Sequence, residues 1–181
     1  MIQPRTQTKT KVLNYFFLNE GKEIYINELA RLIEADPKNV FRILVRLQGE
    51  GLLKSEFRGK ERFFSVNKGN PLYKHYKEIF LKTAGLEHSL GERLKGVKNL
   101  KEAYIFGSYA SGRHEAMSDI DVLLIGNHSS LEAQKAVYDL QRETGRDINI
   151  IDLTPGELSK KKRQNDGFIK NIFAGKMVRL L

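Results

Sequence analysis

The apolar residues in the first third of the chain recur first at helical and then at alternating spacing. They follow a helical period through residues 4–19, and the alternating stretch 22–26 predicts a short strand. Two further helical runs lie within residues 27–53, where Asp36 and Pro37 break the first run and begin the second. This pattern predicts two helices joined by a tight turn.

The second of these two helices has contrasting faces. Its apolar stripe consists of Val40, Ile43, Leu44 and Leu47. On the opposite face, basic residues recur every four positions, at Lys38, Arg42 and Arg46. Residues 52–57 and 61–66 then have strand character and flank a short basic turn that contains a glycine, which predicts a hairpin.

A helical stretch over residues 71–95 leads to a second group of strands. Strands are predicted at residues 101–106, 119–125 and 147–155, the last after an amphipathic helix at 131–144. The final residues of the chain supply packing residues and a last edge strand. The fold class predicted from this order of elements is α+β.

Composition narrows the class of protein. A hydrophobic fraction of 40% with 29% charged residues is typical of a soluble globular protein, and no apolar run approaches the length of a membrane span. We therefore expect a cytoplasmic protein without membrane contact. The chain has no cysteine, and its four histidines (His75, His88, His114 and His128) lack ligand-like spacing, so a bound metal would be a hard cation held by oxygen.

The net charge of +9 is unevenly distributed along the chain. Residues 1–100 contain 19 basic and 11 acidic side chains, whereas the remaining residues are nearly balanced. The basic excess of the first half indicates a polyanionic partner for that half.

The segment INELARLIEADPKNVFRILVRLQGEGLL, followed by the basic hairpin, resembles the winged helix-turn-helix DNA-binding domain. The resemblance covers roughly residues 1–70 and implies binding of double-stranded DNA through a helix in the major groove. The residues that it directs to phosphates, base edges or a flanking groove are Lys38, Asn39, Arg42, Arg46, Arg58 and Lys60. The alternative is a domain of the same shape that is used for protein contacts.

Asp119 and Asp121 lie one residue apart in a run that otherwise suits a buried strand. Because side chains alternate along a strand, both carboxylates point to the same face and need a cation between them. A P-loop starting at Gly107 is excluded because Arg113 and His114 stand where Lys and Ser or Thr are required. A calcium loop is excluded because Leu123 and Leu124 occupy positions that require an oxygen ligand and a glycine.

The string GSYASGRHEAMSDIDVLL resembles the signature of the minimal nucleotidyltransferases of the DNA polymerase β superfamily. The resemblance covers about residues 86–155 and implies a mixed sheet flanked by helices. It further implies that Gly107 and Ser108 contact the phosphates of a nucleoside triphosphate and that Asp119 and Asp121 hold Mg²⁺ or Mn²⁺. The two aspartates would then be the catalytic carboxylates.

Active members of this superfamily have a third carboxylate on a later strand. The matching strand here is DINIIDLTP, and aligning its apolar residues places Asn149 at that position. Asp147 lies two residues upstream, so its side chain points to the same face of the strand as that of Asn149. The resemblance therefore implies Asp147 or Asn149 as the third metal ligand. An amide cannot accept a proton from an attacking hydroxyl, so Asn149 in this place weakens the case for catalysis more than the case for binding.

The sequence thus predicts a winged-helix domain at residues 1–70, a helical connector at 71–85 and a nucleotidyltransferase-like domain at 86–181. One hypothesis is a DNA-binding enzyme that transfers a nucleoside monophosphate to an unknown acceptor. A second is a transcriptional regulator that senses a nucleotide without turning it over. A third is an antitoxin-like partner of a toxin. The aromatic stripe of the connector also fits a homodimer interface.

Overall fold

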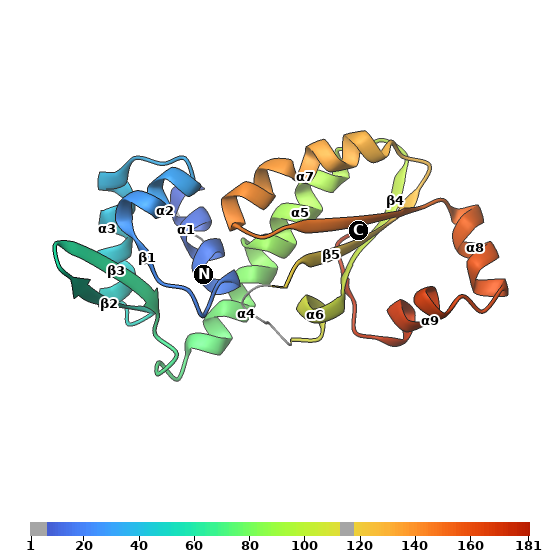
Figure 1. Ribbon diagram of the computed structural model, residues 1–181. Helices are drawn as coiled ribbons and strands as arrows, with labels where there is room; N and C mark the ends of the chain where they lie inside the picture. Colours follow the sequence, from blue (N-terminus) through green and yellow to red (C-terminus); the bar gives the residue numbers. More distant parts are fainter. Residues whose placement is uncertain (1–6, 113–117) are drawn as a thin grey trace. The chain divides into compact units, whose positions relative to one another are not determined.

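The computed structural model describes residues 7–112 and 118–181, which form two compact units (Figure 1). The N-terminal unit comprises the chain up to Leu86 together with Arg142–Gly145, and the C-terminal unit comprises Glu87–Gln141 and Arg146–Leu181. Within the described ranges, no helix is both long enough and apolar enough to cross a membrane.

The N-terminal unit contains the helices and the hairpin expected from the sequence. Its elements are α1 (Gln7–Leu18), β1 (Ile24–Tyr25), α2 (Ile26–Leu32), α3 (Pro37–Gly49), β2 (Leu53–Arg58), β3 (Glu61–Val66) and α4 (Tyr73–Thr83). The Asp36 side chain caps α3 by accepting a hydrogen bond of 2.9 Å from the backbone N–H of Asn39. The break between α2 and α3 therefore lies where the sequence predicts it.

The helix α3 buries one face and exposes the other. Val40, Leu44 and Leu47 are fully buried, as the apolar stripe in the sequence predicts. The hairpin of β2 and β3 turns at Gly59, which has a positive φ of 62°, and it lies beside α3 in Figure 1. The three strands of this unit form a sheet in the order β1-β3-β2.

The helix α4 contributes to the core of the N-terminal unit. The ring of Phe17 in α1 makes edge contacts with the rings of Tyr73 and Phe80, at centroid distances of 5.7 and 5.4 Å. Lys77 of α4 is buried and pairs with Glu20 at 2.5 Å. A large part of the helical stretch predicted as a connector thus packs within this unit.

The C-terminal unit is built around a mixed four-stranded sheet. Its elements are α5 (Leu86–Lys95), β4 (Leu100–Phe106), α6 (Gly107–Ala110), β5 (Ile120–Gly126), most of α7 (Ser130–Thr144), β6 (Ile148–Leu153), α8 (Pro155–Arg163), α9 (Gly167–Ala174) and β7 (Val178–Arg179). The strand order is β6-β5-β4-β7, in which β5 and β6 are parallel and the other pairs are antiparallel. The predicted final edge strand is β7.

The strand β5 is buried on both faces, which explains its nearly unbroken apolar sequence. On one face, Leu123 and Ile125 belong to a cluster that includes Ile169 and Ile172 of α9. On the other face, Ile120, Val122 and Leu124 are fully buried. The polar side chains of the candidate site therefore lie at the N-terminal end of β5, where this burial begins.

Candidate functional site

Three polar side chains meet at the N-terminal end of β5. Asp119 directly precedes this strand and Asp121 is its second residue. The parallel strand β6 places Asn149 opposite Asp121 in the register. The side-chain amide of Asn149 donates a hydrogen bond of 3.1 Å to Oδ2 of Asp119 and also hydrogen-bonds with Asp121. Asn149 is therefore shared between the two carboxylates.

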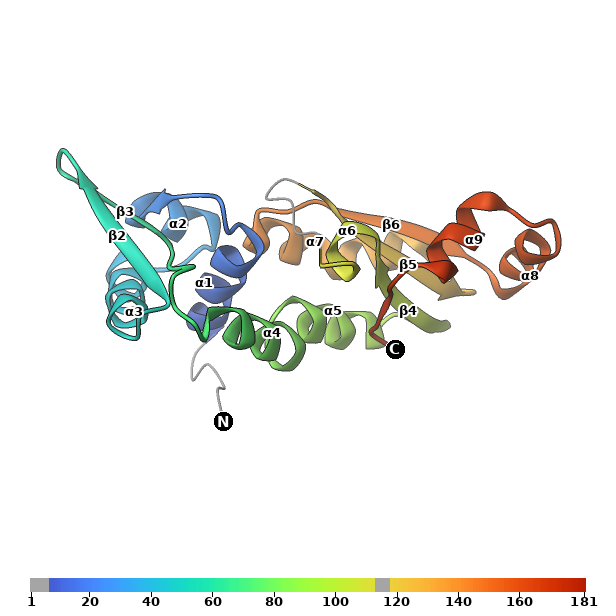
Figure 2. The same ribbon diagram turned by 90° about the horizontal axis from the view of Figure 1, so that it is seen from below.

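The backbone of Gly107 lies against the carboxylate of Asp121 on one side of this group. Gly107 begins α6, which lies against β4 and β5 as Figure 2 shows. Its φ is +74°, and a Cβ built at this position would lie 2.5 Å from Oδ2 of Asp121. Glycine is thus required here both by the backbone conformation and by the close approach of the carboxylate.

The hydroxyl of Ser108 connects the turn to the residue before Asp119. Ser108 Oγ donates to Ser118 Oγ at 2.9 Å. The structure therefore brings the Gly-Ser half and the Asp-x-Asp half of the sequence motif together. Arg113 and His114, which argue against a P-loop in the sequence, lie outside the described residues.

The electrostatics of this group favour a cation. Burial raises the pKa of Asp121 above its usual value, and the negative charge of Asp119 raises it further, whereas the hydrogen bond from Asn149 opposes the rise. A raised pKa means that the ionised carboxylate is disfavoured by its surroundings. A positive charge placed between the two carboxylates would remove that cost.

Arg146, which the sequence analysis did not identify, lies near Ser118 and Asp119. It is 9% exposed, and its Nη2 donates to the backbone carbonyl and to Oγ of Ser118. Burial lowers the pKa of Arg146, and the charge of Asp119 partly restores it. The residue supplies a positive charge near Asp119 and fixes Ser118. A single arginine before a strand has no pattern that marks such a role.

Asp147 occupies a different position from Asn149. It precedes β6, it is exposed, and its backbone carbonyl accepts a hydrogen bond of 2.8 Å from the N–H of Ile120. In the parallel register, Asp147 lies two residues before the position opposite Asp121. Among the described residues, no group of three acidic or histidine side chains is arranged to hold a metal ion.

The donor set nevertheless fits a hard divalent cation. Asp119 and Asp121 offer carboxylate oxygens, and Asn149 offers an amide oxygen once its side chain turns. Mg²⁺ is commonly bound through one or two carboxylates together with the phosphates of its substrate. Two carboxylates and one amide are thus sufficient for a site that a nucleotide completes.

The basic residues predicted to contact DNA lie on α3 and the hairpin, and several have partners. Lys38, Arg42, Arg46 and Lys60 are exposed. Arg42 donates to Oδ1 of Asn39 at 3.0 Å, and Asn39 in turn donates to Thr8 at 3.4 Å.

Two of these arginines form ion pairs on the surface. Arg46 pairs with Glu50 at 2.9 Å, and Arg58 pairs with Glu23 at 2.6 Å and with Glu56 at 3.1 Å. Exposed ion pairs contribute little to stability, because water screens their charges. They can therefore exchange for contacts with phosphate at little cost.

Comparison with known proteins identifies the family. Residues 86–178, just over half of the chain, match the nucleotidyltransferase domain, so the chain belongs to that family. No curated protein matches the chain at a significant level.

Several solved structures resemble part of the chain. A toxin–antitoxin complex with AMP-PNP has 19% identity and a TM-score of 0.39, over 52% of this chain and 72% of that one. A mutant of the toxin–antitoxin pair MntA–HpeT has 17% identity and the same TM-score and coverage. A candidate nucleotidyltransferase from Sulfolobus solfataricus has 28% identity and a TM-score of 0.28, over 41% of this chain and 68% of that one.

Proposed function

We propose that the C-terminal unit binds a nucleoside triphosphate with Mg²⁺ or Mn²⁺ and transfers the nucleoside monophosphate to an acceptor. Asp119 and Asp121 hold the cation, while Gly107 and Ser108 contact the phosphates. The observation that carries this proposal is the approach of Gly107 to Asp121, because an added Cβ would lie 2.5 Å from the carboxylate. This contact joins the phosphate-binding turn to the metal-binding strand.

The proposed reaction forms a bond between an acceptor oxygen and the α-phosphorus and breaks the bond from that phosphorus to the pyrophosphate. A bound divalent cation would offset the negative charge that develops on the phosphate oxygens. The two carboxylates would hold the cation, and Arg146 fixes the side chain of Ser118, the residue before Asp119. The acceptor's proton passes to water, because the neutral amide of Asn149 cannot accept it.

The same amide favours a second candidate function, which is nucleotide sensing without turnover. Replacing a third carboxylate by an amide removes one negative charge and the general base, while two carboxylates remain for binding. A protein with this site would bind nucleotide and release it unchanged, and its DNA binding would respond to the nucleotide.

For the N-terminal unit we propose a winged helix that binds double-stranded DNA, with α3 in the major groove and the β2–β3 hairpin as the wing. The support is the line of exposed basic residues Lys38, Arg42 and Arg46 along α3, opposite its buried face, together with Arg58 and Lys60 at the hairpin turn. The positive charge of the first half of the sequence agrees with this arrangement.

A labelling experiment separates transfer from sensing. The full chain is incubated with Mg²⁺ and a nucleoside triphosphate radiolabelled at the α-phosphate, with and without a cell extract that supplies acceptors. Label that enters a macromolecule, and that is lost when Asp119 and Asp121 are changed to asparagine, supports transfer. Nucleotide binding without label in either condition supports the sensor and overturns the enzyme.

A further inference from the structure

Two exposed apolar side chains lie on α3 beside its basic residues. Phe41 is 43% exposed and Val45 is 40% exposed. They are four residues apart, so they form one line along the helix. The core face of α3 is already complete without them, because Val40, Leu44 and Leu47 fill it. Their position on the surface is therefore not explained by the folding of this unit.

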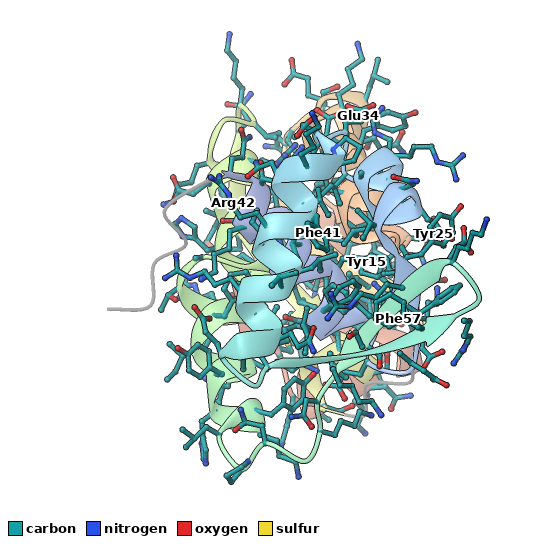
Figure 3. The ribbon with its side chains drawn as sticks, turned by 90° about the vertical axis from the view of Figure 1, so that its left-hand side faces the viewer. Tyr15, Tyr25, Glu34, Phe41, Arg42 and Phe57 are labelled. Atoms are coloured by element: carbon teal, nitrogen blue, oxygen red, sulfur yellow. The ribbon has the colours of Figure 1, made fainter. Side chains whose placement is uncertain are left out.

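Figure 3 shows how these side chains are arranged around α3. Phe41 extends from the helix on the side of the hairpin, toward Phe57 and Tyr25, whereas Arg42 extends on the opposite side. A groove of about 330 Å³ lies between α3 and the hairpin, and its lining includes Tyr25, Phe41, Phe57, Lys60 and Arg62. The apolar line of α3 is thus flanked by positive charge on both sides, although Glu61 also lines the groove.

The charge on this face is consistent with an anionic occupant that also presents small apolar groups. Duplex DNA has this combination, since phosphates border the major groove and the C5-methyl of thymine is the apolar group on its base edges. Asn39, the residue of this face best suited to hydrogen-bond a base, is engaged by Arg42 and Thr8. The middle of α3 therefore offers Phe41 and Val45 to the base edges.

We infer that Phe41 and Val45 determine sequence specificity by contacting thymine methyl groups in the major groove, so that the binding site contains A·T pairs at the positions they face. This inference rests on the proposed DNA binding of the N-terminal unit. Arg42 and Arg46, in the neighbouring line, contact phosphates and carry no sequence information.

The test uses the full chain and begins with selection from a randomised duplex library at one fixed salt concentration, because affinity depends strongly on salt. Each thymine of the selected site is then replaced singly by deoxyuridine, which lacks the methyl group and keeps the same hydrogen-bonding edge. Each contacted methyl should strengthen binding about fourfold, the value for burying one such group. Thymines outside the contacted positions should show no change.

Variants connect the effect to particular side chains. Phe41→Ala should remove the thymine preference at one position and Val45→Ala at another, whereas Phe41→Leu should keep part of it. Ile79→Ala is the matched control, because Ile79 is 47% exposed but lies on α4, outside the residues that line the groove. It should keep the preference. Arg42→Ala should weaken binding equally to the thymine and deoxyuridine duplexes.

The outcomes distinguish this inference from the function on which it rests. If the chain binds no duplex even at low salt, the proposed DNA binding is wrong and the inference falls with it. If it binds duplexes but thymine and deoxyuridine behave alike, DNA binding stands and the inference is overturned. A thymine preference that is unchanged at every position in both Phe41→Ala and Val45→Ala also overturns it.

Discussion

The side-chain amide of Asn149 donates a hydrogen bond to the carboxylate of Asp119 at 3.1 Å, from a strand position directly opposite Asp121. Three functional groups thus share one end of the sheet, and two of them carry negative charge. The N–H groups of the neutral third side chain offset part of the repulsion between the two carboxylates. A carboxylate in its place would make a cation a requirement.

Changing Asn149 to aspartate should therefore alter both metal binding and turnover. Without divalent cations we expect a lower melting temperature than that of the wild type, since three carboxylates then repel one another. With Mg²⁺ and a nucleoside triphosphate, the rise in melting temperature should exceed that of the wild type. Transfer of radiolabel in cell extract should increase by about a hundredfold or more, the usual contribution of a general base.

Asp147→Asn is the control for this prediction, because it removes a carboxylate two residues away along the chain. It should leave nucleotide binding and transfer unchanged. If the wild type transfers label briskly, Asp147→Asn abolishes the activity and Asn149→Asp has no effect, then Asp147 rather than Asn149 occupies the third position.

Gly107→Ala should disable the site through Asp121. The new Cβ would lie 2.5 Å from Oδ2, so the carboxylate must move. Gly112→Ala is a matched control, because Gly112 has the same φ of +74° and no described atom lies within 4 Å of its added Cβ. Both variants should lose about 1–2 kcal/mol of stability from backbone strain. Calorimetric titration with Mg²⁺ and nucleotide should show lost binding in Gly107→Ala alone, and equal affinities would disprove the role of this contact.

The arginines of α3 should govern the salt dependence of DNA binding. Arg42→Ala and Arg46→Ala should each weaken binding to every duplex and lower the slope of log affinity against log salt by about 0.9. Lys176→Ala removes the same charge from an exposed position in the C-terminal unit and should change neither quantity. Fluorescence anisotropy over a range of salt concentrations measures both. Equal effects of all three variants would indicate binding through net charge alone.

The pair formed by Glu20 and Lys77 should make the stability of the N-terminal unit depend on pH. Burial pushes the pKa of Glu20 up, but the hydrogen bond and charge of Lys77, helped by Lys68, outweigh burial and lower it below 4.5. A lowered folded-state pKa means that this stabilisation is present above the unfolded value and is lost as the pH falls through the folded value.

Glu20→Gln should therefore lower the free energy of unfolding at neutral pH, by about 1–2 kcal/mol because Glu20 is partly exposed while Lys77 is buried. The difference from the wild type should shrink as the pH falls through the lowered folded-state pKa of Glu20, where the wild-type carboxyl also becomes protonated. Glu78→Gln, which breaks the exposed pair with Lys82, should leave the free energy of unfolding nearly unchanged. Denaturant unfolding followed at several pH values tests both variants.

Much of the fold was predictable because its signals are local. Asp36 and Pro37 begin α3 through a side-chain cap and a fixed φ, and neither depends on distant contacts. The mixed sheet of the C-terminal unit was predicted from the resemblance of its sequence to the minimal nucleotidyltransferases. The extent of the connector was harder to predict, because the packing of Phe80 against Phe17 joins residues far apart in the sequence.

The candidate site was predictable where residues alternate on a strand and less so where strands meet. Asp119 and Asp121 were identified from their apolar neighbours, and the structure places Asn149 opposite Asp121. Arg146 was missed because its importance comes from burial beside Ser118 and Asp119, which are far from it in the sequence. The exposure of Phe41 likewise follows from the way α3 packs, which periodicity does not determine completely.

The most direct test of the proposed site is the melting temperature of the full chain with and without Mg²⁺ and a nucleoside triphosphate. Ligands that bind the folded state raise its stability, by about 2.7 kcal/mol at a concentration one hundred times the dissociation constant. We predict a clear rise for the wild type and for Asp147→Asn, and no rise when Asp119 and Asp121 are both changed to asparagine. A rise that persists in this double variant would place the nucleotide elsewhere and contradict the proposed site.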